Sequence, residues 1–278
     1  MEASGSITAR VKSIALDCGA AACGIAAAGD LAEFERFSAA AAAAPPGLAY
    51  LTRNPLKRKN IKNWLPAARS VLVCAFSYWG PERDYDKELA GAGPLPAYLA
   101  VSGRKPQQQE LLTAPGARIS RYALGPDYHI TVKEKLARAL AALHKEFPGV
   151  EGRIFCDTSP VMEKELARLA GLGFRGRNTL IVSPELGSYV FLGGIALDLE
   201  LRPDAPSNGS CGGCERCIRA CPTGALKDGA LDAGLCLSYW TTQAKEKIPE
   251  PLARLGGGWA YGCDACQTAC PLNEKTRV

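Results

Sequence analysis

Apolar positions along the N-terminal part of the chain follow two different periods. Residues 6–19 and 127–147 carry apolar side chains every three or four positions, which predicts helices. Residues 21–28, 70–78 and 189–201 are runs rich in apolar, β-branched or aromatic side chains, which predicts buried strands. Helical and strand patterns are interleaved, so we expect a domain of mixed helices and sheet.

One strand–turn–helix unit carries an acidic residue at its centre. The apolar residues 153–156 lead into Asp157, and a turn then precedes a helical pattern over residues 161–171. The local pattern favours Asp157 as the N-cap of that helix. The carboxyl end of a strand is also where open α/β sheets place ligand chemistry, so a functional role stays open at this point.

Glycine and proline mark the expected bends and boundaries. The pair at residues 193–194 predicts a bend inside the last strand, and residues 80–118 read as one long loop. Residues 203–209, PDAPSNG, break the composition of the chain. We therefore expect two domains, residues 1–203 and residues 204–278.

Composition narrows the class of protein. The chain has 278 residues, 47% of them hydrophobic, and a net charge of +5, which permits a nucleic-acid partner without requiring one. Its twelve cysteines would suit a disulfide scaffold in a short secreted chain, but the start, MEASGSITARVKSIALD, does not resemble a signal peptide. No apolar run is long enough to cross a membrane. We expect a cytoplasmic protein with reduced thiols and no membrane association.

Two further sets of polar residues have no single interpretation. Residues 53–62 hold five positive charges, which describes either a solvated loop or a site for phosphate or carboxylate groups. His129 and His144, the chain's two histidines, stand in no metal-ligand spacing, so we expect a surface or packing role for both.

The strongest chemical signal is the spacing of eight cysteines after residue 210. The first four stand as C-x2-C-x2-C-x3-C-P and the last three as C-x2-C-x3-C-P, with one cysteine between the two motifs. Two-cluster ferredoxins use this spacing, and the fourth cysteine of each motif ligates the cluster of the other. We expect two 4Fe–4S clusters. Structural zinc fits less well, because zinc sites usually draw on two C-x2-C pairs set far apart.

The second motif lacks its first cysteine, because Ala260 stands at that position. Either the second cluster has three irons, or a thiolate from elsewhere completes it. Cys236 has no other evident role, and we assign it as the replacement. The crossed ligand sets are Cys211, Cys214, Cys217 and Cys270 for the first cluster, and Cys221, Cys236, Cys263 and Cys266 for the second.

Two clusters in series conduct electrons, so they need an external low-potential donor and an acceptor. The part of the chain before the cysteines is larger than an electron carrier requires. We expect it to hold a substrate or a second cofactor, which the residues do not name by themselves.

Several segments resemble the epoxyqueuosine reductase family. Together they cover most of residues 48–273 in the family's order, and the part within residues 156–201 is the more specific. The segments are AYLTRNPLKRKNIKNWLPAARSVLV, SRYALGPDYHITVKEKL, CDTSPVMEKELARLAGLGFRGRNTLIV, GSYVFLGGIALDLEL, CLSYWTT and YGCDACQTACPLN.

This resemblance implies a cobalamin-dependent enzyme that removes the epoxide oxygen of epoxyqueuosine in tRNA. It implies an α+β fold, in which an N-terminal α/β domain holds cobalamin and a C-terminal ferredoxin-like domain passes electrons through two clusters to the cobalt. Asp157 matches the family's proton donor and cofactor neighbour, which reverses the local preference for a helix cap. A desolvated pocket would then raise the pKa of Asp157. Further positions that match cobalamin contacts are Arg58, Asn178, Thr179, Leu180, Ile181, Tyr239, Gln243 and Asp264.

The chain departs from the family's pattern in three places. Ser159 replaces the glycine of D-T-G-P, and Gln243 replaces the glutamate of S-Y-x-T-I-E. Many members also continue into a helical-repeat segment that contributes to tRNA binding, whereas this chain ends at Val278. Either the catalytic domains alone hold tRNA, with Lys57, Lys59 and Lys62 as candidate phosphate contacts, or the substrate differs.

Two alternatives remain. A cobalamin-dependent reductive dehalogenase would also join a cobalamin domain to two clusters, although such enzymes usually carry a twin-arginine leader. A plain ferredoxin-type electron carrier would use the N-terminal domain only to dock its partners.

Overall fold

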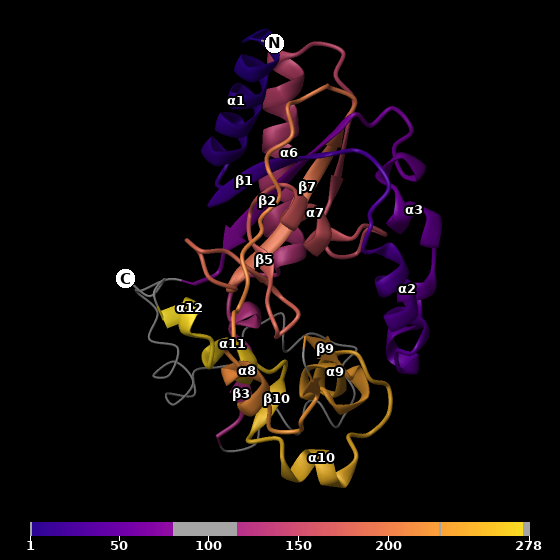
Figure 1. The fold of residues 1–278 in the computed structure, drawn as a ribbon, viewed down its shortest axis with the longest axis vertical. Helices are drawn as coiled ribbons and strands as arrows, with labels where there is room; N and C mark the ends of the chain where they lie inside the picture. The colour runs from indigo at the N-terminus through magenta and orange to yellow at the C-terminus, as the bar shows by residue number, and fades with distance from the viewer. Residues whose placement is uncertain (1, 80–115, 228, 275–278) are drawn as a thin grey trace.

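The computed structural model describes residues 2–79, 116–227 and 229–274, and Figure 1 shows them as two packed units. The loop expected over residues 80–118 lies almost wholly outside these ranges. Within the described part of the chain, no helix combines the length and the apolar character needed to span a bilayer.

The N-terminal unit is a four-stranded sheet with helices on both faces (Figure 1). The strands are β1 (Ala22–Ala27), β2 (Ser70–Ser77), β4 (Gly152–Phe155) and β7 (Val190–Leu197). Their order is β1-β2-β7-β4, and each neighbouring pair is antiparallel. The helices are α1 (Glu2–Asp17), α2 (Phe34–Ala42), α3 (Pro55–Lys59), α6 (Tyr128–Glu146) and α7 (Glu163–Leu169), with 3-10 turns η1 (Pro46–Thr52), η2 (Ile61–Asn63) and η3 (Arg121–Ala123). The expected mixture of helices and sheet is confirmed. The order and antiparallel pairing of the strands could not be predicted from the hydrophobic pattern of the sequence.

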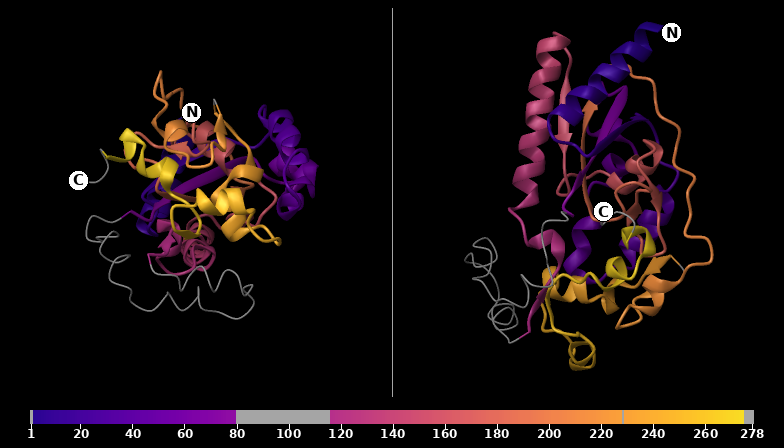
Figure 2. Two further views of the ribbon diagram at one scale, coloured as in Figure 1. Left: turned by 90° about the horizontal axis from the view of Figure 1, so that it is seen from below. Right: turned by 90° about the vertical axis from the view of Figure 1, so that its left-hand side faces the viewer.

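Strand β2 explains why this sheet is buried on both faces. Successive side chains of a strand point to opposite faces, so an uninterrupted apolar run serves two cores. Residues Leu72, Cys74 and Phe76 join α1 and α6 in one hydrophobic cluster, and residues Val71, Val73 and Ala75 join α7 in the other. Figure 2 shows α1 and α6 side by side along their face of the sheet.

Close packing, and not a bend, accounts for the glycine pair in β7. The strand keeps an unbroken register with β2 from Val190 to Leu197. A Cβ placed on Gly194 would lie 2.2 Å from the carbonyl oxygen of Leu72. This distance is too short for any side chain, so the position requires glycine. Gly24 in β1 is equally confined, because a Cβ there would lie 2.0 Å from the carbonyl oxygen of Ala170 after α7.

The C-terminal unit is built from short elements with little regular structure. Its helices are α8 (Arg216–Arg219), α9 (Leu237–Thr242), α10 (Glu250–Arg254), α11 (Ala265–Thr268) and α12 (Pro271–Glu274), with the 3-10 turn η4 (Ala233–Leu235). Its strands are β8 (Leu226–Lys227), β9 (Ala230–Leu231) and β10 (Trp259–Tyr261), while β5 (Phe174–Arg175) and β6 (Ile181–Val182) form a hairpin that the N-terminal unit contributes. β3 (Arg118–Ile119) pairs in parallel with β10, so a segment from the first half of the chain completes the second unit.

The segment between the units is tied to the sheet. Asp204 forms an ion pair with Lys12 at 2.6 Å, and its second carboxylate oxygen accepts a hydrogen bond from the backbone N–H of Ile25 at 2.7 Å. The N–H of Ser207 donates to the carbonyl of Arg168. The expected boundary between residues 203 and 204 therefore falls inside a segment that packs along the N-terminal unit.

The confinement of Gly24 generates a stability prediction. Replacing Gly24 with alanine should lower the free energy of unfolding by about 1–3 kcal/mol, because the new methyl group must displace the backbone of Ala170. Gly29→Ala is the matched control, since nothing lies within 4 Å of a Cβ at that position. Urea denaturation of both variants measures the difference, and equal midpoints would contradict the packing argument.

Candidate active site between the two units

Asp157 occupies a strained backbone position directly after β4. Its φ is 52°, in the left-handed region that aspartate adopts more readily than most residues. Its N–H donates to the Glu163 carboxyl group, which holds the turn in place. The side chain of Asp157 does not cap α7, whose N-cap position is Met162. The helix-cap interpretation is therefore wrong, and the side chain is free for other contacts.

The side chain of Asp157 forms a carboxylate–imidazole–carboxylate chain at the start of α6. His129 Nε2 lies 3.0 Å from Asp157 Oδ2, and His129 Nδ1 lies 2.8 Å from Asp127 Oδ1. The hydrogen bond that His129 donates to Asp157, supported by the one to Asp127, raises the pKa of His129. The hydrogen bond from His129, supported by that from Tyr128, lowers the pKa of Asp157. The expected rise in the pKa of Asp157 is wrong, because two donors stabilise the carboxylate.

The carboxyl group whose pKa is raised is that of Glu163. The surrounding protein desolvates it and raises its pKa to about 8, although Lys164, Arg58 and the Asp157 N–H act in the opposite direction. Desolvation lowers the pKa of the neighbouring Lys164, whose ammonium donates to the Thr179 carbonyl at 3.1 Å. Two ionisable groups with shifted pKa values thus lie close to Asp157, as is typical of functional sites.

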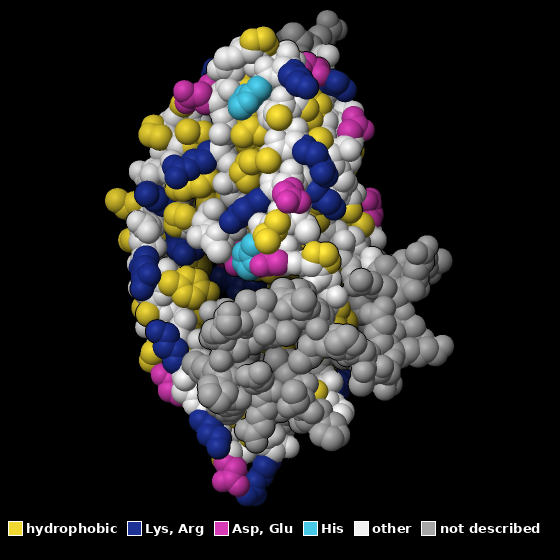
Figure 3. Space-filling model, turned by 180° about the vertical axis from the view of Figure 1, so that it is seen from behind, with side chains coloured by type: hydrophobic (Ala, Val, Ile, Leu, Met, Phe, Trp, Pro, Cys, Tyr) yellow, Lys and Arg dark blue, Asp and Glu magenta, His cyan; other side chains and the backbone are white. Residues whose placement is uncertain are grey.

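Asp157 faces a cavity of about 730 Å³ between the two units. Arg58 from α3 and Gln243 from the end of α9 also line it. Arg58 is only 9% exposed, and its Nε has no hydrogen-bond partner among the described residues, so it can serve an acceptor brought by a ligand. Seen from behind, Figure 3 shows one of the two histidines beside acidic side chains at the rim of a hollow.

A second cavity, of about 400 Å³, connects Asp157 with the cysteine motifs. Among the residues predicted to contact cobalamin, Asn178, Thr179 and Leu180 line it. They form the tight loop between β5 and β6, in which Thr179 has a φ of 65° and the Asn178 side chain accepts from the Leu180 N–H. The cysteines on its wall are Cys221, Cys236, Cys263 and Cys266. Asp157 belongs to both cavities.

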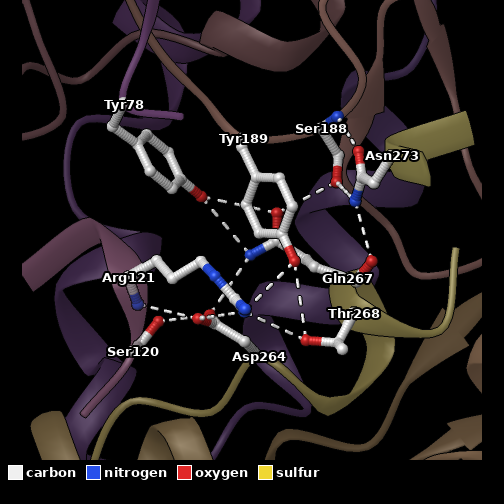
Figure 4. Close-up of polar contacts among 9 residues, drawn as sticks. All are labelled: Tyr78, Ser120, Arg121, Ser188, Tyr189, Asp264, Gln267, Thr268 and Asn273. Carbon is white, nitrogen blue, oxygen red and sulfur yellow. Dashed lines mark hydrogen bonds and ion pairs between the residues drawn. The ribbon is translucent and has the colours of Figure 1, made fainter. Parts of the chain in front are cut away.

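Three of the predicted contacts lie away from the cavity walls. Ile181 is buried in the hydrophobic core beside α7. Tyr239 is 5% exposed, and its hydroxyl accepts from the Gly47 N–H of η1 at 3.3 Å, which joins α9 to the N-terminal unit. Asp264 is fully buried, and Ser120 and Arg121 donate hydrogen bonds to its carboxylate (Figure 4).

The motif cysteines are free thiols, and most of them lie near one another. Cys217 has Cys211 and Cys270 as its electrostatic neighbours, and Cys263 has Cys236 and Cys221. Cys266 has Cys263 and Cys236 as neighbours and also Cys217, so the two groups adjoin. Cys236 is therefore placed beside the second motif. In the first motif, Cys211 Sγ accepts a hydrogen bond from the Arg177 N–H at 3.4 Å. Groups of thiolates with hydrogen-bond donors around them suit iron–sulfur clusters.

Two family models match the chain. A 4Fe-4S double cluster binding domain matches residues 210–273, and the model described as Epoxyqueuosine reductase QueG, DUF1730 matches residues 58–158. An epoxyqueuosine reductase from Synechocystis sp. is 36% identical over 80% of this chain and 68% of its own length. The chain belongs to the epoxyqueuosine reductase family. Relatives from Cyclobacterium marinum and Leadbetterella byssophila are 35% and 41% identical, and the matches span 66% and 56% of their lengths.

Solved structures of this family share the fold. The epoxyqueuosine reductase from Streptococcus thermophilus matches 97% of this chain and 66% of its own, with 28% identity and a TM-score of 0.78. One with an epoxyqueuosine-modified tRNA stem loop matches equally well, at 29% identity over 98% of this chain and 66% of its own. The reductive dehalogenase NpRdhA, at 19% identity and a TM-score of 0.57 over 99% of this chain and 33% of its own, shares the fold alone. The expected family, the α+β fold and the double-cluster domain are confirmed.

Two residues of the site were missed from the sequence. His129 was expected at the surface or in packing, yet it contacts Asp157. Glu163 was given no role, although it is the last residue of the quoted segment D-T-S-P-V-M-E. The signal for His129 was its place two residues after a helix-capping aspartate.

The raised pKa of Glu163 generates a prediction on the pH dependence of stability. The folded state holds this proton more tightly than the unfolded state, so its stabilising effect is complete below pH 4.5 and is lost as the pH rises through about 8. In the variant Glu163→Gln, the side-chain amide oxygen can still accept the hydrogen bond from the Asp157 N–H, but the side chain carries no charge. Between these pH values, wild-type protein should lose on the order of 2–3 kcal/mol relative to the variant, since water in the cavity screens part of the full shift.

Anaerobic urea unfolding from pH 5 to pH 9 measures this difference. Glu134→Gln, on the exposed face of α6, is the control and should follow wild type at every pH. Parallel curves for wild type and Glu163→Gln would show that Glu163 is ionised in the folded protein.

Proposed function

We propose that this protein reduces epoxyqueuosine in tRNA to queuosine with cobalamin as its cofactor and electrons supplied through two 4Fe–4S clusters. The observation that carries the proposal is the pair of cavities that meet at Asp157, one of them walled by four motif cysteines. Removal of the epoxide oxygen as water consumes two electrons and two protons. The site offers a route for the electrons on one side of Asp157 and a proton-holding group on the other.

The proposed cluster ligands keep the crossed arrangement. Cys211, Cys214, Cys217 and Cys270 hold the first cluster, and Cys221, Cys236, Cys263 and Cys266 hold the second. The two groups of thiols support this division, and the second set faces the smaller cavity. Electrons therefore enter at the first cluster and leave from the second.

Residues on both cavities fit a large amide-rich cofactor. Arg58 offers a buried donor without a partner, and the loop of Asn178, Thr179 and Leu180 offers backbone and side-chain polar groups. Gln243, which replaces a family glutamate, lines the larger cavity and can donate and accept there. Cobalamin supplies a low-potential metal that can deliver electrons to the epoxide carbon. Ile181, Tyr239 and Asp264 line neither of these cavities.

In the proposed mechanism, the proton is stored on His129 and passes through Asp157. The raised pKa of His129 and the lowered pKa of Asp157 favour an imidazolium–carboxylate pair at neutral pH. Asp157 is the residue of the pair exposed to both cavities, so it delivers the proton to the departing oxygen. Asp127 holds the other ring nitrogen and fixes the orientation of the imidazole.

The proposed substrate is a tRNA that carries epoxyqueuosine, as in the stem-loop complex of the relative. The proposed phosphate contacts are Lys57, Lys59 and Lys62. Lys57 and Lys59 are the neighbours of Arg58 on α3, Lys62 lies in η2, and Arg58 lines the larger cavity. The electrons are proposed to come from an external low-potential donor. A cytoplasmic location would agree with a tRNA substrate and with reduced thiols.

Turnover of epoxyqueuosine-containing tRNA by reconstituted, cobalamin-loaded protein tests this function. Asp157→Asn should lower kcat by about 10²–10⁴-fold, because asparagine tolerates the left-handed backbone but cannot transfer the proton. In wild-type protein kcat should fall as the pH rises above the raised pKa of His129, and His129→Gln should abolish that dependence. His144→Gln, at the far end of α6, is the control. Retained turnover in Asp157→Asn would contradict the proposed role, and unconverted tRNA with wild type would contradict the function.

Iron analysis tests the role of Cys236. Cys236→Ala should reduce the iron content from about eight to about four per chain, because the second cluster loses one of its four thiolates. Cys18→Ala, in the N-terminal unit, should keep about eight. If both variants contained the same iron, Cys236 would not be a ligand.

A further inference from the structure

Asp264 stands between two proposed ligands of the second cluster, and it is the most buried carboxylate of the C-terminal unit. It lies between Cys263 and Cys266 at the start of α11, with none of its surface exposed. Burying a carboxylate costs free energy unless hydrogen bonds or an ion pair compensate for the lost hydration.

Every side-chain partner of Asp264 is a donor (Figure 4). Ser120 Oγ donates to Oδ1, and Gln267 Nε2 approaches the same oxygen at 3.5 Å. The Arg121 N–H donates to Oδ2 at 2.7 Å, and its guanidinium forms an ion pair with that oxygen at 3.7 Å. Burial raises the pKa of Asp264, whereas the hydrogen bonds from the Arg121 N–H and the Ser120 hydroxyl and the Arg121 guanidinium act in the opposite direction. The backbone N–H and the guanidinium can only donate, so these contacts favour the charged carboxylate.

Arg121 supplies a buried countercharge, to which the charge of Arg118 adds. The side chain of Arg121 is 10% exposed, and its guanidinium packs over the rings of Trp79 and Tyr189 at 5.2 and 5.4 Å. Its Nη1 also bonds to the hydroxyls of Tyr189 and Thr268 at 3.4 and 3.2 Å. The guanidinium is thus fixed in place beside the carboxylate, and Figure 4 shows its polar contacts.

The charge of Asp264 acts on the proposed cluster ligands directly, since Cys263 and Cys266 both lie within its electrostatic range. A fixed negative charge opposes the addition of an electron nearby, and a fixed positive charge favours it. These effects are strong here because little water screens the site. Charge near a cluster is one of the means by which proteins set its potential.

We propose that Asp264 and Arg121 set the reduction potential of the second cluster, Asp264 lowering it and Arg121 raising it. A lower potential at this cluster favours onward transfer of its electron into the smaller cavity. The inference rests on the proposed ligand set and not on the substrate. It gives the Asp264 position a role that needs no contact with cobalamin.

The test is a redox titration of the reconstituted, corrinoid-free protein, followed by electron paramagnetic resonance. Asp264→Asn should make the midpoint potential of one cluster less negative, and Arg121→Gln should make the same potential more negative. That cluster should be the one missing from Cys236→Ala. The potential of the other cluster should change less in both variants, and Glu250→Gln, a neutralised carboxylate that is 74% exposed on α10, should match wild type.

The opposite signs separate a charge effect from loosened packing, which has no reason to reverse between the two variants. Unchanged potentials, or shifts of the same sign in both, would overturn the proposal. If Asp264→Asn does not retain its clusters, the downward shift in Arg121→Gln decides by itself. Because the titration uses neither tRNA nor corrinoid, its result is independent of the proposed reductase activity.

Discussion

The parallel pairing of β3 with β10 joins the two halves of the molecule and determines what lies between them. The chain that leaves β3 passes through Ser120 and Arg121, which bind Asp264, and then through η3 into α6. Tyr122 on this path contacts Tyr128 and Tyr261 edge-on or tilted, with ring centroids 6.2 and 6.1 Å apart, and lines both cavities. The same short segment therefore fixes the cluster-bearing unit and the residue pair Tyr128–His129 that contacts Asp157. A shift of one unit against the other would change the cavity and the proton-holding pair together.

Several ionisable side chains lie close together around Asp157. Glu163 and Lys164 line the smaller cavity with Asp157, Arg58 lines the larger one, and desolvation acts against the charged form of each. Acidic and basic groups that lie close together partly stabilise one another, so the three charges offset part of the cost of their desolvation. This explains why the carboxyl group with the raised pKa is Glu163, which has no histidine partner, while Asp157 stays ionised beside His129. Local sequence cannot separate these two outcomes, because both residues are acidic and lie six positions apart.

The sequence predicted well what depends on short-range spacing. The helices of residues 6–19 and 127–147, the strands and the paired cysteine motifs follow from periodicity and from fixed offsets. It predicted poorly what depends on distant contacts. The glycines of β7 are required by the neighbouring strand, and His129 gains its role from a residue 28 positions away. Among the expected cofactor contacts, those on the β5–β6 loop line a cavity. Ile181 instead packs in the core, and Tyr239 accepts a hydrogen bond from the Gly47 N–H, which are contacts that the motif does not encode.

The departure at Ser159 shows how backbone strain is distributed in this site. The family's turn has glycine there, which suggests a need for the left-handed region, yet Ser159 is not among the non-glycine residues with positive φ. The positive φ falls on Asp157 two residues earlier, where aspartate bears it at a cost of about 1–2 kcal/mol. The hydrogen bond from the Asp157 N–H to Glu163 and the contact of its side chain with His129 offset that cost. A serine is acceptable at position 159 for this reason, and the strained residue is the one whose side chain must point into the cavities.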